Sequence, residues 1–144
     1  MQTDFLVIGS GIAGLTYALK VAQQCSDKTV TILTKTQSDE TNTKYAQGGI
    51  AGVMDFSQDS FSKHIEDTLV AGDGLCDEDV VREMAAKGPE LIQRLLDYGV
   101  QFSPSENLDE GQYALGREGG HSRRRILHCK DMTGREIEKR LLEN

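Results

Sequence analysis

The sequence predicts an α/β fold organised around a parallel sheet. Three observations carry this prediction. An apolar run at residues 5–8 leads directly into glycines at positions 9, 11 and 14. A segment with helical apolar spacing follows, and a β-branched run at residues 29–34 comes after it. Two strands joined through a helix lie parallel in one sheet, so we expect the chain to open with a βαβ unit over residues 4–35.

The first strand is expected over residues 4–9 and buried on both faces, because Phe5–Ile8 is continuously apolar. The spacing that follows is typical of a Rossmann-like dinucleotide-binding turn. Gly9 permits the tight turn, Gly11 lets the backbone approach a pyrophosphate, and Gly14 lets the helix pack close to the strand. The pyrophosphate would then bind free N–H groups at the helix start.

The end of the second strand departs from the pattern of a plain NAD site. NAD-binding units place an acidic residue there to hold the ribose hydroxyls. This chain has Lys35 at that position, and its first acidic residue after the strand is Asp39. A cation at this place suits a phosphate or an adenine edge, and the alternative is a solvated surface lysine.

Residues 36–55 are polar and then glycine-rich, which predicts a loop followed by short extended backbone. Helical patterns then cover residues 60–98, with Asp77 as an expected N-cap, an interruption at Gly88-Pro89 and a stop at Gly99. His64 falls on the first of these helices and is expected at the surface.

The last part of the chain is expected to contain a loop, a short strand at residues 125–128 and a helix that starts from Asp131-x-Thr133-Gly134. That helix is still running at Asn144. With only two strands available for a parallel sheet, we expect the front of a larger protein, and a compact single domain is the alternative.

Composition and charge exclude several function classes. The chain has 144 residues, about one domain, and its 38% hydrophobic and 27% charged residues are typical of a globular protein. A net charge of −7 argues against nucleic-acid binding, and no apolar run reaches the roughly 20 residues of a membrane helix. The start lacks the basic region of a signal peptide, and the three cysteines form no C-x-x-C pair. We expect a cytoplasmic protein with no metal site, no nucleic-acid partner and no membrane partner.

Two further segments have the residue types of a binding site. Residues 42–52 combine three glycines and small alanines, which let backbone approach a flat ring, with Thr43 and Gln47 as hydrogen-bond donors. An ordinary glycine-rich turn is the alternative. Residues 117–128 gather arginines, two histidines and Glu118 around a glycine pair. That field suits a carboxylate substrate, because arginine binds carboxylates in a bidentate fork.

Taken together, these segments resemble one family. The chain is similar to the N-terminal part of the L-aspartate oxidases, which belong to the succinate dehydrogenase/fumarate reductase superfamily of flavoproteins. The resembling motifs are V-I-G-S-G-I-A-G-L at 7–15, T-K at 34–35, Y-A-Q-G-G-I-A at 45–51, R-E-G-G-H-S at 117–122, R-I-L-H at 125–128 and D-M-T-G at 131–134.

The resemblance implies that residues 1–144 are the N-terminal part of an FAD-binding domain, with the capping domain and the catalytic acid/base elsewhere in the protein. FAD would be the dinucleotide, residues 42–52 would form the flavin loop, and residues 117–134 would form the substrate-side segment. Succinate dehydrogenases and fumarate reductases carry a covalently flavinylated histidine where this chain has Asn42, so non-covalent FAD is expected. The implied FAD contacts are Gly9, Ser10, Gly11, Ile12, Ala13, Gly14, Lys35, Asn42, Thr43, Lys44, Tyr45, Ala46, Gln47, Gly48 and Gly49.

The activity implied by the resemblance is oxidation of L-aspartate to iminoaspartate by hydride transfer to flavin N5, with oxygen (forming hydrogen peroxide) or fumarate as the acceptor. This is the first step of NAD biosynthesis through quinolinate, with a hand-off to quinolinate synthase. Glu118 would pair with the α-ammonium group of aspartate, and His121 and Ser122 would help to hold a substrate carboxylate. The alternatives are a fumarate reductase-like flavoprotein and a non-catalytic dinucleotide-binding module.

Overall fold

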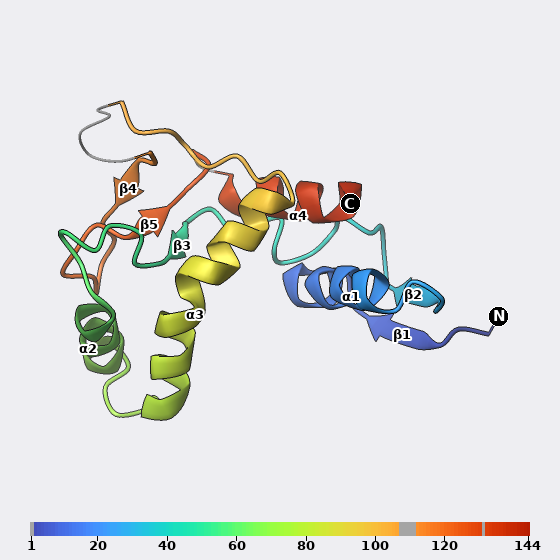
Figure 1. The fold of residues 1–144 in the computed structure, drawn as a ribbon, viewed down its shortest axis with the longest axis horizontal. Helices are drawn as coiled ribbons and strands as arrows, with labels where there is room; N and C mark the ends of the chain where they lie inside the picture. Colours follow the sequence, from blue (N-terminus) through green and yellow to red (C-terminus); the bar gives the residue numbers. More distant parts are fainter. Residues whose placement is uncertain (1, 107–111, 131) are drawn as a thin grey trace.

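The computed structural model describes residues 2–106, 112–130 and 132–144 and confirms an α/β fold with a parallel sheet (Figure 1). The βαβ unit lies at one end of the molecule, and a helix pair and a second small sheet lie at the other (Figure 1). In chain order the elements are β1 (Phe5–Ile8), α1 (Ile12–Gln24), β2 (Val30–Leu33), β3 (Ile50–Ala51), α2 (Phe61–Ala71), α3 (Glu78–Asp97), β4 (Leu115–Gly116), β5 (Ile126–Leu127) and α4 (Thr133–Glu143).

The predicted βαβ unit is confirmed. β1 pairs with β2 in parallel, in a register that places Phe5 opposite Val30. The prediction of a first strand buried on both faces is wrong, because Leu6 is 56% exposed and Ile8 is 80% exposed. The physical reason is that α1 packs on one face of this two-stranded sheet, and no helix of the described residues covers the other face (Figure 1).

The predicted interruption at Gly88-Pro89 does not occur, since α3 runs without a break from Glu78 to Asp97. Proline in a helix interior removes one backbone hydrogen bond and usually costs about 3 kcal/mol or more. Here both halves of the helix bury the same face, with Ala85 before the proline and Ile92 after it. Packing of that face stabilises the continuous helix, so tertiary contacts override the local signal.

The residues predicted to start and to end this helical region are confirmed at the two ends of α3. The side chain of Asp77 accepts hydrogen bonds from the backbone N–H groups of Asp79 and Val80 at the start of α3. At its end, Gly99 has a φ of 89°, the left-handed conformation of a C′ glycine. The N–H of Val100 then donates to the carbonyl of Leu95, which closes a Schellman motif.

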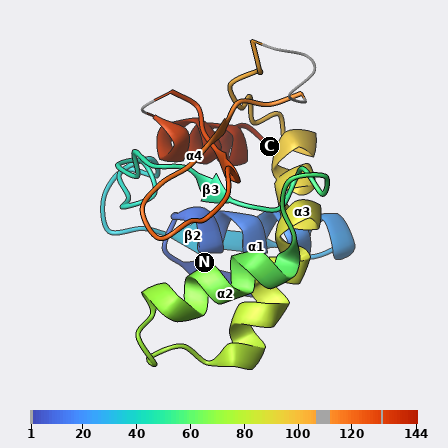
Figure 2. The same ribbon diagram turned by 90° about the vertical axis from the view of Figure 1, so that its left-hand side faces the viewer.

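A second sheet pairs β3, β5 and β4 antiparallel, in that order. The strand predicted at residues 125–128 is therefore the centre of this sheet. One hydrophobic core joins α1, α3, β5, α4 and the segment after α3 through Leu15, Ile92, Val100, Phe102, Leu127, Ile137 and Leu141. α4 lies above α1 in both ribbon views and holds the βαβ unit to the rest of the molecule (Figures 1 and 2).

α4 begins at Thr133, and its N-cap Met132 makes no side-chain capping bond. Asp131, expected at the start of this helix, lies outside the described residues. Among the helices of the described residues, none is long and apolar enough to cross a membrane.

Candidate functional site

Two glycines of the first turn have the roles predicted for them, Gly9 in the tight turn and Gly14 in the close packing of helix and strand. Gly9 adopts a φ of 105°, a conformation that side-chain-bearing residues rarely adopt. A Cβ atom on Gly14 would lie 2.0 Å from the carbonyl oxygen of Gly9, so α1 packs directly against the end of β1. A Cβ on Gly11 would lie 3.3 Å from Oγ1 of Thr43, so residues 42–52, termed the flavin loop after their predicted role, reach this turn.

The N-terminus of α1 is a suitable place for a diphosphate. Gly11 provides no side-chain cap, and the first turn of the helix contains no acidic residue. The N–H groups of Ala13 and Gly14 have no acceptor within the helix, and the helix dipole adds positive potential at this end. Ile12 N–H donates to Thr43 Oγ1 over 3.1 Å. The arrangement fits the pyrophosphate bridge of a dinucleotide.

Ser10 and Lys35 lie near the end of β2. The hydroxyl of Ser10 is buried and donates to Thr34 Oγ1 over 3.3 Å, so its side chain joins β1 to the end of β2. Lys35 directly follows Thr34 and is exposed. The structure therefore places the predicted cation at the end of β2, beside the first turn.

The flavin loop is held by backbone contacts with α4 and β5. The N–H of Gly134 donates to the carbonyl of Ala46 over 3.0 Å. A Cβ on Gly134 would lie 1.8 Å from the carbonyl oxygen of Thr43, so only glycine allows α4 to approach the loop. A Cβ on Gly49 would lie 2.3 Å from the carbonyl oxygen of Leu127. These contacts fix the loop beside the first turn.

The charged side chains of the flavin loop turn back toward the segment before it. Lys44 Nζ lies 2.9 Å from Asp39 and 3.4 Å from Glu40, and the Tyr45 hydroxyl donates to Glu40. The hydrogen bond with Asp39 raises the pKa of Lys44. An exposed stretch with little charge is left for a planar ring, made by Asn42, Ala46, Gln47, Gly48 and Gly49.

Residues 117–125, here termed the Glu118 turn, lie against this loop. Glu118 is exposed, and its two carboxylate oxygens are 3.6 and 3.7 Å from the position that a Cβ on Gly48 would take. The predicted substrate-side carboxylate and the predicted flavin loop are therefore neighbours, although 70 positions separate Gly48 and Glu118 in the sequence.

A buried arginine anchors the Glu118 turn. The side chain of Arg125 is fully buried and forms a bidentate pair with Asp59, with Nε to Oδ2 at 2.7 Å and Nη2 to Oδ1 at 2.9 Å. Its Nη1 also lies 2.6 Å from Asp67 on α2. Burial alone would raise the pKa values of both carboxyl groups, but hydrogen bonds from Arg125 and from backbone N–H groups lower them below the ordinary value.

The same network determines what His121 and Ser122 can donate. Arg125 Nη1 lies 3.1 Å from His121 Nδ1, and a guanidinium only donates, so Nδ1 is an acceptor and the ring proton of the neutral imidazole is on Nε2. The N–H and hydroxyl of Ser122 both bond to Asp67 Oδ2, at 2.8 and 2.9 Å. The hydroxyl hydrogen of Ser122 is thus used within the protein.

His64 is not the surface residue that the sequence predicts. It is half-buried, and its Nδ1 is buried without a hydrogen-bond partner among the described residues. Its ring centroid lies 5.9 Å from that of His121. Burial, together with the positive charge of Arg125, lowers the pKa of His64. The prediction is wrong because the face of α2 that carries His64 and Asp67 packs on the Glu118 turn.

Sequence reasoning missed the roles of Arg125, Asp59 and Asp67. The arginine run was predicted to attract a substrate carboxylate, whereas Arg125 forms ion pairs with two carboxylates of the protein itself. One available signal was the position of Arg125 immediately before the buried pair Ile126-Leu127. Asp59 and Asp67 carry no comparable signal, because each precedes or lies on an amphipathic helix like many surface acids.

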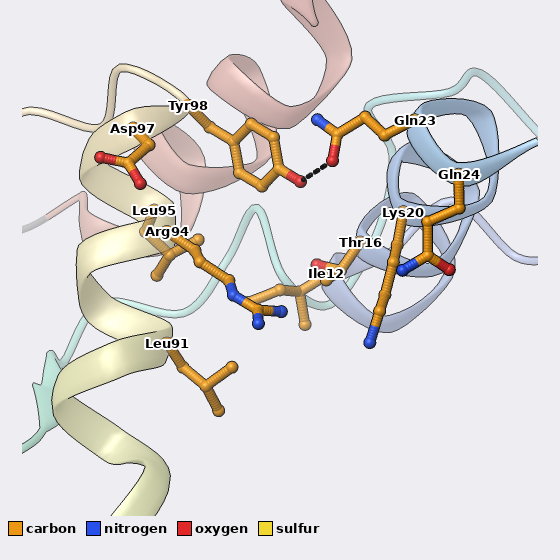
Figure 3. A pocket seen from close by; sticks show the side chains of 10 residues that line it. All are labelled: Ile12, Thr16, Lys20, Gln23, Gln24, Leu91, Arg94, Leu95, Asp97 and Tyr98. Atoms are coloured by element: carbon orange, nitrogen blue, oxygen red, sulfur yellow. Dashed lines mark hydrogen bonds between the residues drawn. The ribbon is translucent and has the colours of Figure 1, made fainter. Parts of the chain in front are cut away.

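A separate hollow of about 460 Å³ lies between α1 and α3 (Figure 3). Tyr98 and Gln23 face each other across it, with the Tyr98 hydroxyl 3.5 Å from Gln23 Oε1 (Figure 3). Ile12 is the only predicted FAD contact in its lining. This hollow is therefore distinct from the surface formed by the first turn, the flavin loop and Glu118.

Comparisons with known proteins agree with this geometry. The profile of the FAD binding domain family matches residues 4–144. An L-aspartate oxidase from Nicotiana tabacum is 53% identical over 97% of this chain, and one from Yersinia pestis is 49% identical over 97%. The chain spans 21% and 26% of these relatives, respectively.

The fold matches solved flavoprotein subunits. Quinol fumarate reductase from E. coli superposes with a TM-score of 0.90 at 30% identity, over 99% of this chain and 24% of that one. Sdh1 from Mycobacterium smegmatis has a TM-score of 0.87 at 30% identity, over 96% and 23%. The uncapped start of α1, the glycines that admit neighbouring backbone and the family match lead to one conclusion: the chain belongs to the FAD binding domain family, and FAD is its cofactor.

Proposed function

We propose that the protein containing this chain oxidises L-aspartate to iminoaspartate, with oxygen or fumarate as the electron acceptor. The observation that carries the proposal is the position of Glu118, whose carboxylate lies against Gly48 of the flavin loop. When bound, FAD supplies the acceptor for the substrate hydride. A substrate beside the loop would be within reach of Glu118, and the named relatives are L-aspartate oxidases.

Glu118 supplies the selectivity in this proposal. Its negative charge pairs with the α-ammonium group of an amino dicarboxylate, and succinate has no such group. His121 would donate from Nε2 to a substrate carboxylate, because its Nδ1 accepts from Arg125. Ser122 would contribute by position alone, since its hydroxyl and N–H bond to Asp67.

The proposed FAD contacts lie along the first turn, the end of β2 and the flavin loop. The N–H groups at the start of α1 would bind the diphosphate, with Gly9, Gly11 and Gly14 keeping the backbone accessible. Lys35 would lie toward the adenosine end. The exposed backbone at 46–49 would lie along the ring. Asn42 has no nucleophilic nitrogen, so FAD would bind without a covalent bond.

The central test is the visible spectrum of the full-length protein. Bleaching of the flavin bands by aspartate under anaerobic conditions, with no bleaching by succinate, is the expected result. Bleaching by succinate alone would favour the fumarate reductase-like alternative, and a colourless protein that binds only NAD would favour a non-catalytic module. Acid precipitation should release the flavin into the supernatant. The separate 144-residue chain is expected to form no peroxide from aspartate.

A Glu118→Gln variant tests the assigned selectivity. A hydrogen bond to a charged group contributes about 1.5–3 kcal/mol, so we expect kcat/KM for aspartate to fall about 10- to 100-fold. FAD affinity should not change, because Glu118 is exposed and holds no part of the loop in place. The matched control is Arg117→Gln, an exposed neighbour. An unchanged kcat/KM in the Glu118 variant would remove Glu118 from the substrate site.

Two further features belong to this proposal. One is a transfer of iminoaspartate to quinolinate synthase, which pull-down of that enzyme with the full-length protein would test. The other is a cytoplasmic location, although the plant relatives are named as chloroplastic. Fractionation of source cells tests the location.

A further inference from the structure

A buried carboxylate on α4 has no role in the site described so far. Glu138 is 1% exposed and lies between the core residues Ile137 and Leu141. No cation among the described residues forms an ion pair with it. Burial raises the pKa of its carboxyl group. A buried acid without a cation is costly, so its presence here requires a compensating interaction.

The compensating interaction is a hydrogen bond from Thr41. The Thr41 hydroxyl donates its hydrogen to Glu138 Oε1 and accepts from the N–H groups of Thr43, at 3.1 Å, and of Lys44, at 3.4 Å. A hydroxyl has one hydrogen. Because Glu138 receives it, the lone pairs of Thr41 are directed at the two amides that begin the flavin loop.

The next contact connects this turn to the diphosphate-binding end of α1. Thr43 Oγ1 accepts from the N–H of Ile12 over 3.1 Å, and the same atom lies against Gly11. A continuous series of hydrogen bonds therefore runs from Glu138 through Thr41 and Thr43 to the start of α1. It joins the helix that supports the flavin loop to the helix that carries the first turn.

We propose that Glu138 is a positioning residue of the FAD site. It orients the Thr41 hydroxyl, which holds the turn at residues 41–44, and that turn places Thr43 against the N-terminus of α1. The inference depends on FAD binding by this domain and is independent of the substrate. What Glu138 contributes is an acceptor oxygen directed at Thr41, and its negative charge is not required.

Four variants of the full-length protein test this role. Glu138→Leu and Thr41→Val remove the bond, and Glu138→Gln and Thr41→Ser keep an acceptor or a hydroxyl in place. Glu143→Leu, an exposed site on the same helix, is the control for loss of an acid from α4. The measured quantities are the Kd of FAD, from flavin fluorescence during titration of apoprotein, and the midpoint potential of the bound flavin.

We expect Glu138→Leu and Thr41→Val each to weaken FAD binding about tenfold or more and to shift the midpoint potential. Glu138→Gln, Thr41→Ser and Glu143→Leu should stay within about threefold of the wild type. If Glu138→Gln binds FAD as poorly as Glu138→Leu, the charge is required and the proposal is wrong.

The role is also excluded if Thr41→Val binds FAD like the wild type. That variant replaces no side chain of α4, so its FAD affinity tests the role even if Glu138→Leu fails to fold. A wild-type protein that binds FAD but does not oxidise aspartate contradicts the proposed function and leaves this test intact. Wild-type affinity in every variant contradicts the positioning role alone.

Discussion

The first turn and the Glu118 turn are built in different ways. At Gly9–Gly14 the protein uses backbone: the glycines remove side chains, and the N–H groups at the start of α1 remain accessible. At residues 117–125 the protein uses buried charge, with Arg125 fixed by one carboxylate before α2 and another on it. We expect the first turn to bind through its backbone, whereas the Glu118 turn is held in place by buried ion pairs within the protein.

This difference explains how far each region could be predicted. A backbone site needs glycine at set intervals, so the pattern is local and visible in the sequence. The ion network joins Arg125 to partners 66 and 58 positions away, and only the packing of α2 on the Glu118 turn brings them together. Replacing a glycine of the first turn and replacing a residue of the ion network should therefore have different effects on stability and on FAD binding.

The largest expected effect is that of Arg125→Met. The substitution leaves the buried Asp59 and the largely buried Asp67 without their cation, and breaking a buried pair in this way costs about 3–5 kcal/mol. We expect the free energy of unfolding of the full-length protein to fall by about that amount in urea titrations.

Arg123→Met is the matched control, because Arg123 is an exposed neighbour in the same arginine run. Its expected effect is within about 0.5 kcal/mol. Adding Asp59→Asn and Asp67→Asn to Arg125→Met should recover part of the loss, since the uncompensated charges are removed. Equal stability of the Arg125 and Arg123 variants would mean that the buried network does not support the turn.

The corresponding test of the first turn is Gly14→Ala. Its new Cβ would lie 2.0 Å from the carbonyl oxygen of Gly9, which is too close for any contact, so the backbone of α1 or β1 must shift. Overpacking of this kind costs about 1–3 kcal/mol, and displacement of α1 should weaken FAD binding as well. Unfolding in urea and titration with FAD measure the two effects.

Gly119→Ala provides the control for this substitution, because no heavy atom lies within 4 Å of the Cβ position there. It should leave both the stability and the FAD affinity near the wild-type values. If Gly14→Ala behaves in the same way as Gly119→Ala, then close approach of α1 to β1 is not needed for binding.

The sequence predicted what depends on local spacing. The βαβ unit, the N-cap Asp77, the C′ residue Gly99 and the roles of Gly9 and Gly14 all follow from patterns within a few positions. The continuous helix through Pro89 could not be predicted, because it depends on a face buried by distant segments. Glu138 was also missed, since a glutamate on an amphipathic helix gives no sign that it faces inward.

His64 extends the comparison to pH. Its pKa in the folded protein lies below the unfolded value of 6.5, so between those two values the unfolded chain binds more protons. The stability contributed by neutral His64 is therefore present above pH 6.5 and is lost as the pH falls through the folded pKa. Arg125, His121, Asp59 and Asp67 are the charged and titratable groups that act on it.

The measurement is the free energy of unfolding at pH 7.5 and 5.5. In the His64→Gln variant, the free energy of unfolding should fall less between these two pH values than in the wild type. The difference cannot exceed the contribution of one bound proton. Ser62→Ala, an exposed site on α2, should keep the wild-type dependence. A pH dependence that is the same in the His64 variant would show that other groups produce it.

The smallest effects compare one serine from each region. Ser10→Ala removes the hydroxyl bond to Thr34, and Ser122→Ala removes one of two bonds to Asp67. Each should lower the free energy of unfolding by about 1 kcal/mol.

FAD affinity should stay within about threefold of the wild type in Ser10→Ala, because the first turn binds through backbone N–H groups. Ser122→Ala should instead raise KM for aspartate, since Asp67 then holds residue 122 through its N–H alone. If Ser10→Ala loses as much FAD affinity as Gly14→Ala, a side chain of the first turn contributes to binding, and the contrast between the two regions does not hold.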